Sequence, residues 1–285
     1  MRFLGHSGRR NAACDVRSHF ALGLPWLLYL SSATALHAQP VEPPQPQYGW
    51  RQMWSGADAS HDVWLLYSGV TLAPWSADIH SDGVRLRASG GYGEYSYTAP
   101  SLVTTDCGAP ARDACQFKNQ RYNVAHTYIE ALVGYQKRYG ELTAKAFVGI
   151  AGISHTFDKQ DLDNDTAGDS YGVKGALELW LNLGPVAWTS LDLSHATAHD
   201  TSAARWRAGW RMLPTLSIGP ELRYDSNSSL DKNLAEQYSA RAGGFVRYEW
   251  NGGEVSLASG VSERVVESEA QGRDVYGTAN VLIQF

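Results

Sequence analysis

The chain has 285 residues, enough for one large domain or two modest ones. It carries 24 lysines and arginines against 29 aspartates and glutamates, a formal net charge of −5 at pH 7. This acidic balance argues against a nucleic-acid-binding protein, because such proteins present clustered positive charge to the phosphates.

Residues 1–38 have the layout of a secretory signal peptide. Four arginines precede the apolar run "ALGLPWLLYL" (21–30) and small residues follow it, so we expect cleavage after Ala35 or Ala38. The apolar run is about half of the ~20 residues that a membrane-spanning helix needs. An uncleaved anchor helix is the alternative. Cys14 precedes the apolar run instead of following it, which argues against a lipid anchor.

Residues 39–47 are predicted to be an extended, proline-rich lead-in, and an alternating pattern begins after them. Apolar and polar residues then take turns with a period of two, which indicates strands with one apolar face. In "SAARWRAGWRM" (202–212), for example, two tryptophans lie on one face and three arginines on the other. About twelve such segments are predicted. They begin near residues 48, 62, 82, 121, 141, 170, 186, 202, 215, 237, 253 and 274.

The connections between these segments alternate in length. Short links are predicted at 137–140, 183–185, 213–215 and 251–252, and long polar ones at 99–120, 157–170, 226–236 and 263–273. Near 198–201 the link on the long side is short. Short turns facing longer loops are typical of bacterial outer-membrane barrels, and with twelve strands both chain ends fall on the short-turn side. We therefore predict an all-β fold, a transmembrane antiparallel β-barrel over residues 48–285, located in the cell outer membrane.

The predicted turns keep the two faces apart. Asn251–Gly252 suits a type I′ hairpin turn, which would set Tyr248 opposite Val255. A three-residue turn after Met212 would set Trp210 opposite Ile218. A slip of one residue would mix apolar with polar side chains, so this agreement supports the assignment.

The last predicted strand, 273–285, ends on Phe285, and Leu282 is the one apolar residue on its polar face. We expect this strand to pair with the first one, because a barrel leaves no unpaired edge in lipid. A terminal aromatic residue is also the usual ending of outer-membrane barrels.

The polar face of the strands is predicted to point into the barrel, because an arginine on the lipid face would cost ~2–4 kcal/mol at mid-depth. Two roles remain open: an ion-pair network that braces a narrow barrel, or the lining of a polar passage or sugar-binding surface. A twelve-strand barrel is intermediate between small filled barrels and open porins, so strand number does not decide between them. The predicted lumen lining comprises Arg85, Arg87, Lys145, Lys174, Glu178, Arg205, Arg207, Arg211, Glu221, Arg223, Arg241 and Arg247.

Trp180 and Trp188 are predicted to point inward near the short-turn mouth, directly opposite each other across a three-residue turn. Flat aromatic rings suit glucan chains, because axial C–H groups pack on the ring while hydroxyls reach polar neighbours such as Glu178 and Asn182. One hypothesis is that the pair stacks on a glucan. The alternative is an anchoring pair at the membrane interface.

Only Cys107 and Cys115 follow the predicted signal peptide, in "CGAPARDAC". In an oxidising compartment such a pair is predicted to form a disulfide that closes a small polar loop, and a reactive pair is the alternative. The acidic stretch "DKQDLDNDTAGD" (158–169) resembles a calcium loop, but its glycine is late and the closing glutamate is missing. We therefore predict no metal site and no cofactor.

An outer-membrane enzyme would need a nucleophile, a base and an orienting acid at one height of the barrel. His126 faces the same side as Glu130, and Ser194 lies beside His195, but no such trio lines up along the sequence. We predict a protein that is not an enzyme. A soluble periplasmic β-sandwich that binds polysaccharide remains a further alternative to the barrel, because it would also have strands with one apolar face.

Three stretches together resemble a known family: "SGADASHDVWLLYSGVTLA", "DGVRLRASGGYGEYSY" and "LPTLSIGPELRYD". They are similar to the cellulose biosynthesis protein BcsS family of proteobacteria, and the resemblance extends over roughly residues 50–285. It implies an outer-membrane protein associated with a bacterial cellulose synthase system, assisting export or assembly of the glucan as a passage or a scaffold. The implied partners are outer-membrane lipid, cellulose and other proteins of that system, with no nucleic acid. The resemblance implies no catalytic residues.

Overall fold

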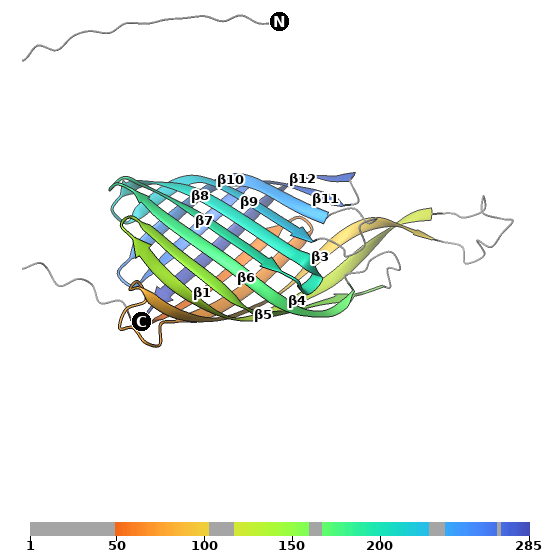
Figure 1. Cartoon of the computed structure of the whole chain (residues 1–285). Coiled ribbons are helices and arrows are strands. Elements are labelled where there is room, and N and C mark those ends of the chain that lie inside the picture. The colour runs from red at the N-terminus through yellow and green to blue at the C-terminus, as the bar shows by residue number, and fades with distance from the viewer. Residues whose placement is uncertain (1–48, 103–116, 160–166, 228–236, 267–268) are drawn as a thin grey trace, which may run out of the picture. The chain divides into compact units, whose positions relative to one another are not determined.

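The computed structural model describes residues 49–102, 117–159, 167–227, 237–266 and 269–285. Over these ranges twelve strands join into one closed antiparallel sheet (Figure 1). Each predicted strand start lies within five residues of an observed one, so the predicted barrel is confirmed. The strands are β1 (Arg51–Ser60), β2 (Val63–Leu72), β3 (Gly83–Leu102), β4 (Phe117–Tyr139), β5 (Leu142–Phe157), β6 (Gly168–Leu183), β7 (Ala187–Ala196), β8 (Thr201–Leu213), β9 (Leu216–Asn227), β10 (Gln237–Trp250), β11 (Gly253–Val266) and β12 (Glu269–Gln284).

β1 and β12 close the barrel, as predicted for the last strand. Their register begins with Gln52 opposite Gln284, and main-chain hydrogen bonds of 3.2 and 3.0 Å join Arg51 and Phe285 in both directions. Each described strand therefore has a hydrogen-bonded neighbour on both sides. The β-sandwich alternative is wrong, because a sandwich consists of two packed sheets and this chain forms a single sheet closed on itself.

The two faces of the sheet separate by polarity. Outward side chains are exposed and largely aliphatic, as at Leu66, Ile129, Ile150 and Val173. Inward positions hold buried polar side chains, among them several arginines and carboxylates. The exterior of the barrel therefore has the apolar surface that a strand needs in order to face lipid.

The predicted registers are confirmed at both hairpins that the sequence singled out. Tyr248 lies opposite Val255, and Trp210 lies opposite Ile218. Apolar residues thus meet on the outer face in both hairpins. Next to the β8–β9 turn the register shifts between Arg211 and Leu213, but the pairing of Trp210 with Ile218 is not affected.

Aromatic side chains gather on the outer face near both ends of the strands. Tyr135, Tyr139 and Trp210 are exposed near the turns on the side of the chain ends. Trp64 and Tyr92 are exposed towards the opposite side, where their rings meet edge to face with centroids 5.5 Å apart. Such belts of aromatic rings are typical of the two membrane–water interfaces of a transmembrane barrel.

The rim that carries Arg51 and Phe285, here called the chain-end rim, has short turns. β4 and β5, β6 and β7, β8 and β9, and β10 and β11 are each joined by two or three residues, which confirms the predicted short links. The exception is the connection from β2 to β3, residues 73–82, which the sequence reasoning did not single out. This ten-residue loop folds back onto the rim through main-chain bonds from Ala73 to Trp50 and from Ile79 to Gly49.

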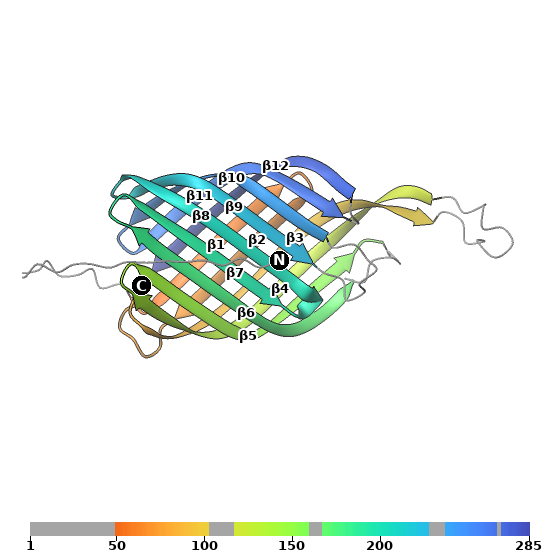
Figure 2. The same cartoon turned by 45° about the horizontal axis from the view of Figure 1, so that its top comes forward.

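The opposite rim, here called the far rim, differs from prediction in two places. The prediction of a long loop at 263–273 is wrong, because β11 runs to Val266 and β12 starts at Glu269. Glu263 lies opposite Arg273 in this extension, and such opposite-charge cross-strand pairs favour continued strand pairing beyond the apolar zone. Likewise β3 and β4 use much of the loop predicted at 99–120, and they extend beyond the other strands (Figure 2).

Several predictions concern segments outside the described residues. These are the signal peptide (1–38), the lead-in (39–47) and the disulfide between Cys107 and Cys115, and all three stay predictions. Most of the acidic stretch 158–169 also lies outside, but Asp158 accepts hydrogen bonds from both nitrogens of Asn123, at 3.0 and 2.9 Å. Within the described ranges we find no helix with the length and apolarity to cross a membrane.

Candidate functional site

The interior of the barrel is the candidate site, because the charged side chains that the sequence placed on the polar face gather there. Four of them, Arg205, Glu221, Arg223 and Arg241, take part in an ion-pair network across the lumen. Lys174 pairs with Glu130 from β4. Six line a cavity near the chain-end rim: Arg87, Lys145, Glu178, Arg207, Arg211 and Arg247. Arg85 is fully buried and does not line this cavity.

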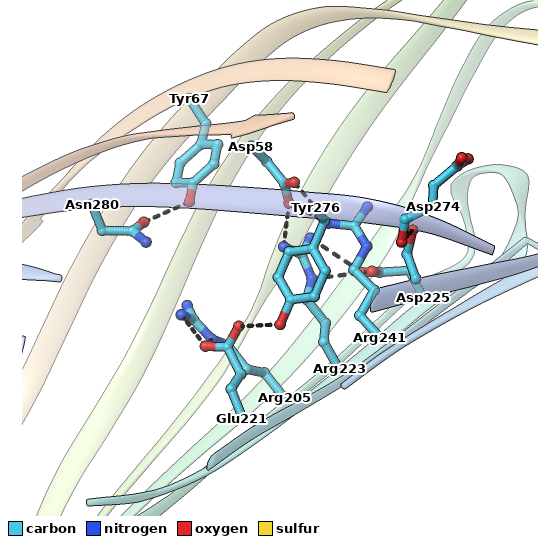
Figure 3. A network of polar contacts seen from close by, with 11 residues as sticks. Asp58, Tyr67, Arg205, Glu221, Arg223, Asp225, Arg241, Asp274, Tyr276 and Asn280 are labelled. Atoms are coloured by element: carbon cyan, nitrogen blue, oxygen red, sulfur yellow. Dashed lines mark hydrogen bonds and ion pairs between the residues drawn. The ribbon is translucent and has the colours of Figure 1, made fainter. Parts of the chain in front are cut away.

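The network across the lumen, here called the central network, is organised by Asp58 of β1 (Figure 3). The Asp58 carboxylate accepts hydrogen bonds from Arg241 at 2.7 and 2.6 Å, and it pairs with Arg223 as well. Arg223 also contacts Asp225, with 3.0 Å between Nε and Oδ2. Because β1 lies three strands from β10 around the barrel, these contacts cross the lumen instead of following the wall.

A second part of the central network is centred on Glu221 of β9. Arg205 donates to Glu221 Oε2 from Nε at 2.8 Å and from Nη2 at 2.6 Å. The Tyr276 hydroxyl of β12 lies 3.5 Å from the other carboxylate oxygen. Near these groups Tyr67 donates to Asn280 at 2.5 Å (Figure 3). Asp58, Glu221 and Tyr276 are 3%, 1% and 1% exposed, so these three side chains are packed inside the barrel, while the side chains of Arg205 and Arg223 keep 22% and 21% of their surface exposed.

Register explains why the carboxylates of the network are needed. Arg223 lies opposite Arg205 on one side and opposite Arg241 on the other, which sets three guanidinium groups in a row across β8, β9 and β10. Like charges on directly opposed residues are destabilising. The carboxylates of Asp58, Glu221 and Asp225 supply three negative charges in contact with this row, so the network is balanced within itself.

A cavity of about 700 Å³ opens at the chain-end rim, and we call it the chain-end cavity. A second one, of about 250 Å³, lies towards the far rim and is lined by Tyr95, His126 and Arg241, among others. The two share no lining residue, and Asp58, Glu221 and Arg223 of the central network line neither. The chain-end cavity is lined by six basic and six acidic residues: Arg87, Arg138, Lys145, Arg207, Arg211, Arg247, Glu130, Glu141, Glu178, Asp192, Glu249 and Glu254.

Trp180 and Trp188 both point inward, but the predicted register between them is wrong. Asn182 lies opposite Trp188, because the turn begins after Leu183 and is closed by Ala187, so the two rings meet diagonally. They stack with centroids 4.1 Å apart and an interplanar angle of 19°. Trp188 is 0% exposed, and its indole donates to Ser217 at 3.2 Å. Only Trp180 of the pair lines the chain-end cavity, so Trp188 has no free face for a glucan.

Arg85 is inward, as predicted, but it is fully buried and lines neither cavity. Its guanidinium donates to main-chain carbonyls, at 2.9 Å to Val84 and 2.9 Å to Ile79, and also to Ser81. Arg85 therefore fixes the 73–82 loop against the rim. The loop in turn places His80 in the lining of the chain-end cavity, where its Nε2 lies 3.0 Å from Gln284 Oε1.

Of the histidines considered as catalytic candidates, His126 lines the second cavity together with Arg241, whereas His195 lines neither cavity. His126 Nδ1 contacts His155 Nε2 at 2.7 Å, so its hydrogen-bonding partner among the described residues is a second histidine. His195 Nδ1 lies 2.9 Å from Ser202 Oγ, while its Nε2 is 3.7 Å from Asp200, longer than a hydrogen bond. Neither arrangement links a nucleophile, a base and an orienting acid through hydrogen bonds.

A family comparison places the barrel among known sequences. A model described as "Cellulose biosynthesis protein BcsS" matches residues 52–285, which is nearly the whole of the barrel. The chain belongs to the BcsS family. The resemblance seen in the sequence is thus confirmed, and the protein is a barrel of the cellulose biosynthesis group.

Solved structures similar to this BcsS-family barrel are distant. The KdgM porin is 10% identical, with 82% of this chain and 99% of that chain covered and a TM-score of 0.43. The translocator domain of the autotransporter NalP from Neisseria meningitidis is 9% identical, with coverages of 82% and 87% and a TM-score of 0.42. At these values no functional conclusion follows from either likeness. A search of curated proteins found no match.

Asp58, Asp225 and Tyr276 belong to the central network of this BcsS-family chain but were not among the predicted lumen residues, and Asp58 makes the most contacts of the three. The predicted lumen lining contained two carboxylates, Glu178 and Glu221, and did not include Asp58. The signal was available in principle: Asp58 is the only charged residue between Arg51 and His61, on a segment otherwise composed of small, apolar or neutral polar residues. A lone carboxylate on such a strand indicates an inward position with a cationic partner.

Acidification is expected to release the 73–82 loop from the rim. Burial lowers the pKa of His80 below its ordinary value, although the hydrogen bond with Gln284 and the charge of Asp78 act in the opposite direction. The undocked loop therefore binds a proton more readily than the docked one. Docking should be complete above the ordinary histidine pKa of about 6.5 and should weaken as the pH falls below it. Limited proteolysis of the loop at about pH 7.5 and about pH 5 measures this.

The control for this prediction is His80→Gln, which retains a hydrogen-bonding group but does not titrate in this range. Cleavage within residues 73–82 should then be nearly independent of pH. If the variant shows the same acid-dependent cleavage as the original protein, another group controls the loop and the assignment to His80 is wrong.

Proposed function

We propose that this BcsS-family protein is an outer-membrane barrel that serves cellulose production as a closed scaffold on the periplasmic side. Family membership supports the link to cellulose biosynthesis. The apolar outer face with its aromatic belts supports insertion in a bilayer, and the predicted export signal at 1–38 would direct the chain there.

The orientation follows the rule for bacterial barrels. Short turns and both chain ends face the periplasm, while longer strand extensions face outward. On this rule the chain-end cavity opens to the periplasm, where a glucan leaving the inner membrane would meet it. β3 and β4 would project from the cell surface (Figure 2).

The observation that carries the scaffold role is the central network. Three guanidinium groups and three carboxylates meet across the lumen, and the two anions that organise them, Asp58 and Glu221, are almost fully buried. A polymer could pass only if these ion pairs opened, and breaking a buried pair is strongly unfavourable. A scaffold that receives a glucan or a partner protein at its periplasmic mouth needs no such opening.

Single-channel recording in planar lipid bilayers tests this proposal. The mature barrel is expected to insert without giving the steady conductance steps of an open porin, because side chains fill its waist. A stable open channel of porin size would instead make the barrel an export passage, the second role that the sequence left open, and would overturn the scaffold role.

A cellular experiment tests the link to cellulose. Deleting the gene in a cellulose-producing bacterium should lower the cellulose found outside the cell, and the intact gene supplied in trans should restore it. If the amount and the location of cellulose are unchanged in the deletion strain, the proposed role of this protein in cellulose production is wrong.

A further inference from the structure

We propose that the chain-end cavity binds a segment of neutral β-linked glucan, which stacks between Trp54 and Trp180. This inference rests on the proposed function, since it names the saccharide that the periplasmic mouth of the scaffold would hold. The chain-end cavity has a volume of about 700 Å³, within the range of roughly 300–1,000 Å³ that is usual for ligand pockets.

The charge of the cavity selects a neutral ligand. Its lining has six basic and six acidic residues. Several are already paired: Arg87 with Glu178 at 2.5 Å, and Arg247 with Glu249 at 2.8 Å. A cavity for an acidic polymer would present an excess of positive charge, because unmatched charges are what distinguish a charged ligand from a neutral one. A balanced lining of hydrogen-bonding groups instead suits a ligand rich in hydroxyls.

Trp180 offers one aromatic face to this cavity. Its other face is covered by Trp188, at 4.1 Å between ring centroids. The Arg247 guanidinium is 4.7 Å from the Trp180 centroid and 5.1 Å from that of Trp188, so it lies beside the stacked pair and not beyond it. The remaining face of Trp180 is therefore directed to the cavity that it lines. The axial C–H groups of a β-linked pyranose can pack on such a face.

Trp54 supplies a second ring on another wall of the same cavity. It lies over Gly69 of β2, where an added Cβ would come within 2.4 Å of the indole, so glycine makes room for the ring. Trp54 is on β1 and Trp180 on β6, with four strands between them in one direction and six in the other. The two rings therefore lie on nearly facing walls of the cavity, where each can offer a stacking surface to a glucan.

Two polar atoms beside Trp180 have no hydrogen-bond partner among the described residues and could serve the sugar hydroxyls. Ser190 lies opposite Trp180 and opposite Arg207, and all three line the cavity. Ser190 Oγ and Arg207 Nε are buried and make no hydrogen bond to the described residues. None of the ion pairs formed within the described ranges includes Arg207. Buried polar groups of this kind normally have a partner, which a glucan hydroxyl or a bridging water would supply.

Isothermal titration calorimetry with cellohexaose and the detergent-solubilised full barrel tests the inference. We expect saturable binding, weakened by about tenfold or more in Trp180→Ala. The uronic-acid form of the same oligosaccharide should bind at least about tenfold more weakly, because it brings negative charge to a balanced cavity. Trp210→Ala is the matched control: it removes an indole that is 60% exposed on the outer face, and binding should not change.

Absence of binding, equal binding by Trp180→Ala, or stronger binding of the uronic-acid form would each overturn the inference. If Trp180→Ala does not fold, Trp54→Ala tests the second aromatic ring of the cavity, and Arg207→Gln tests the guanidinium that forms no ion pair within the described ranges. The outcome is separate from that of the proposed scaffold. If the barrel does not conduct and does not bind cellohexaose, only this inference is overturned. If the barrel conducts and binds cellohexaose, only the scaffold role is overturned.

Discussion

Replacing Asp58 with alanine is expected to lower the free energy of unfolding of the barrel by about 3–5 kcal/mol. Asp58 is the carboxylate that both Arg223 and Arg241 contact, and it is 3% exposed. Its removal leaves two adjacent guanidinium groups inside the barrel with fewer counter-charges, since among the described residues only Arg223 retains an ion pair, with Asp225. Urea unfolding of the barrel in lipid vesicles, followed by the shift between folded and unfolded forms on unboiled gels, measures the change.

Glu249→Ala is the matched control for Asp58→Ala. It also removes a carboxylate that pairs with an inward arginine, Arg247, but its side chain is 32% exposed and Arg247 keeps Glu254 as a second partner. We expect a loss of about 0–1 kcal/mol, as for ion pairs in contact with water. Equal losses in the two variants would contradict the central position assigned to Asp58.

Replacing Trp188 with alanine is expected to lower the free energy of unfolding by about 3–5 kcal/mol as well. Its ring has no exposed surface, stacks on Trp180, and lies 5.4 Å from the ring of Phe245. The alanine variant loses these contacts and leaves a void where the ring was, and it also leaves Ser217 without its indole donor. The same urea titration applies, and Trp188→Phe should lose less because it refills part of the space.

Trp210→Ala removes the same number of atoms from the opposite face of the wall. Trp210 is directed outward and is 60% exposed, so no internal void results. We expect a change within about 1 kcal/mol, as for most surface substitutions. If Trp188→Ala proves no more damaging than Trp210→Ala, then Trp188 does not belong to the packed interior, and its availability to a glucan would have to be reconsidered.

The strands could be predicted from sequence because alternation is a local property. Side chains at successive positions of a strand point to opposite faces, so the position of a residue within a strand decides whether it faces in or out. The turn at Asn251–Gly252 and the pairing of Trp210 with Ile218 followed from the same reasoning. Local alternation does not give strand ends, because polar positions continue the pattern beyond the apolar zone, as they do at Glu263 and Arg273.

The contacts across the lumen could not be predicted in this way. Asp58 meets Arg223 and Arg241 across sequence separations of 165 and 183 residues. Which inward residues share one level depends on the stagger between neighbouring strands summed around the barrel, and no single hairpin carries that information. The role of Arg85 was missed for a related reason, since its partners are main-chain carbonyls of a loop whose path only the folded rim defines.

By itself the sequence determined a twelve-strand barrel of the BcsS family with an apolar exterior and a charged interior, because the alternation within each strand encodes its two faces. Only the tertiary structure decided that a balanced ion-pair network crosses the interior and that Trp180, and not Trp188, lines the chain-end cavity. The physical reason is that closing a sheet into a cylinder brings side chains from distant strands to one level. Charges that are buried there must be paired, because an unpaired buried charge is strongly unfavourable.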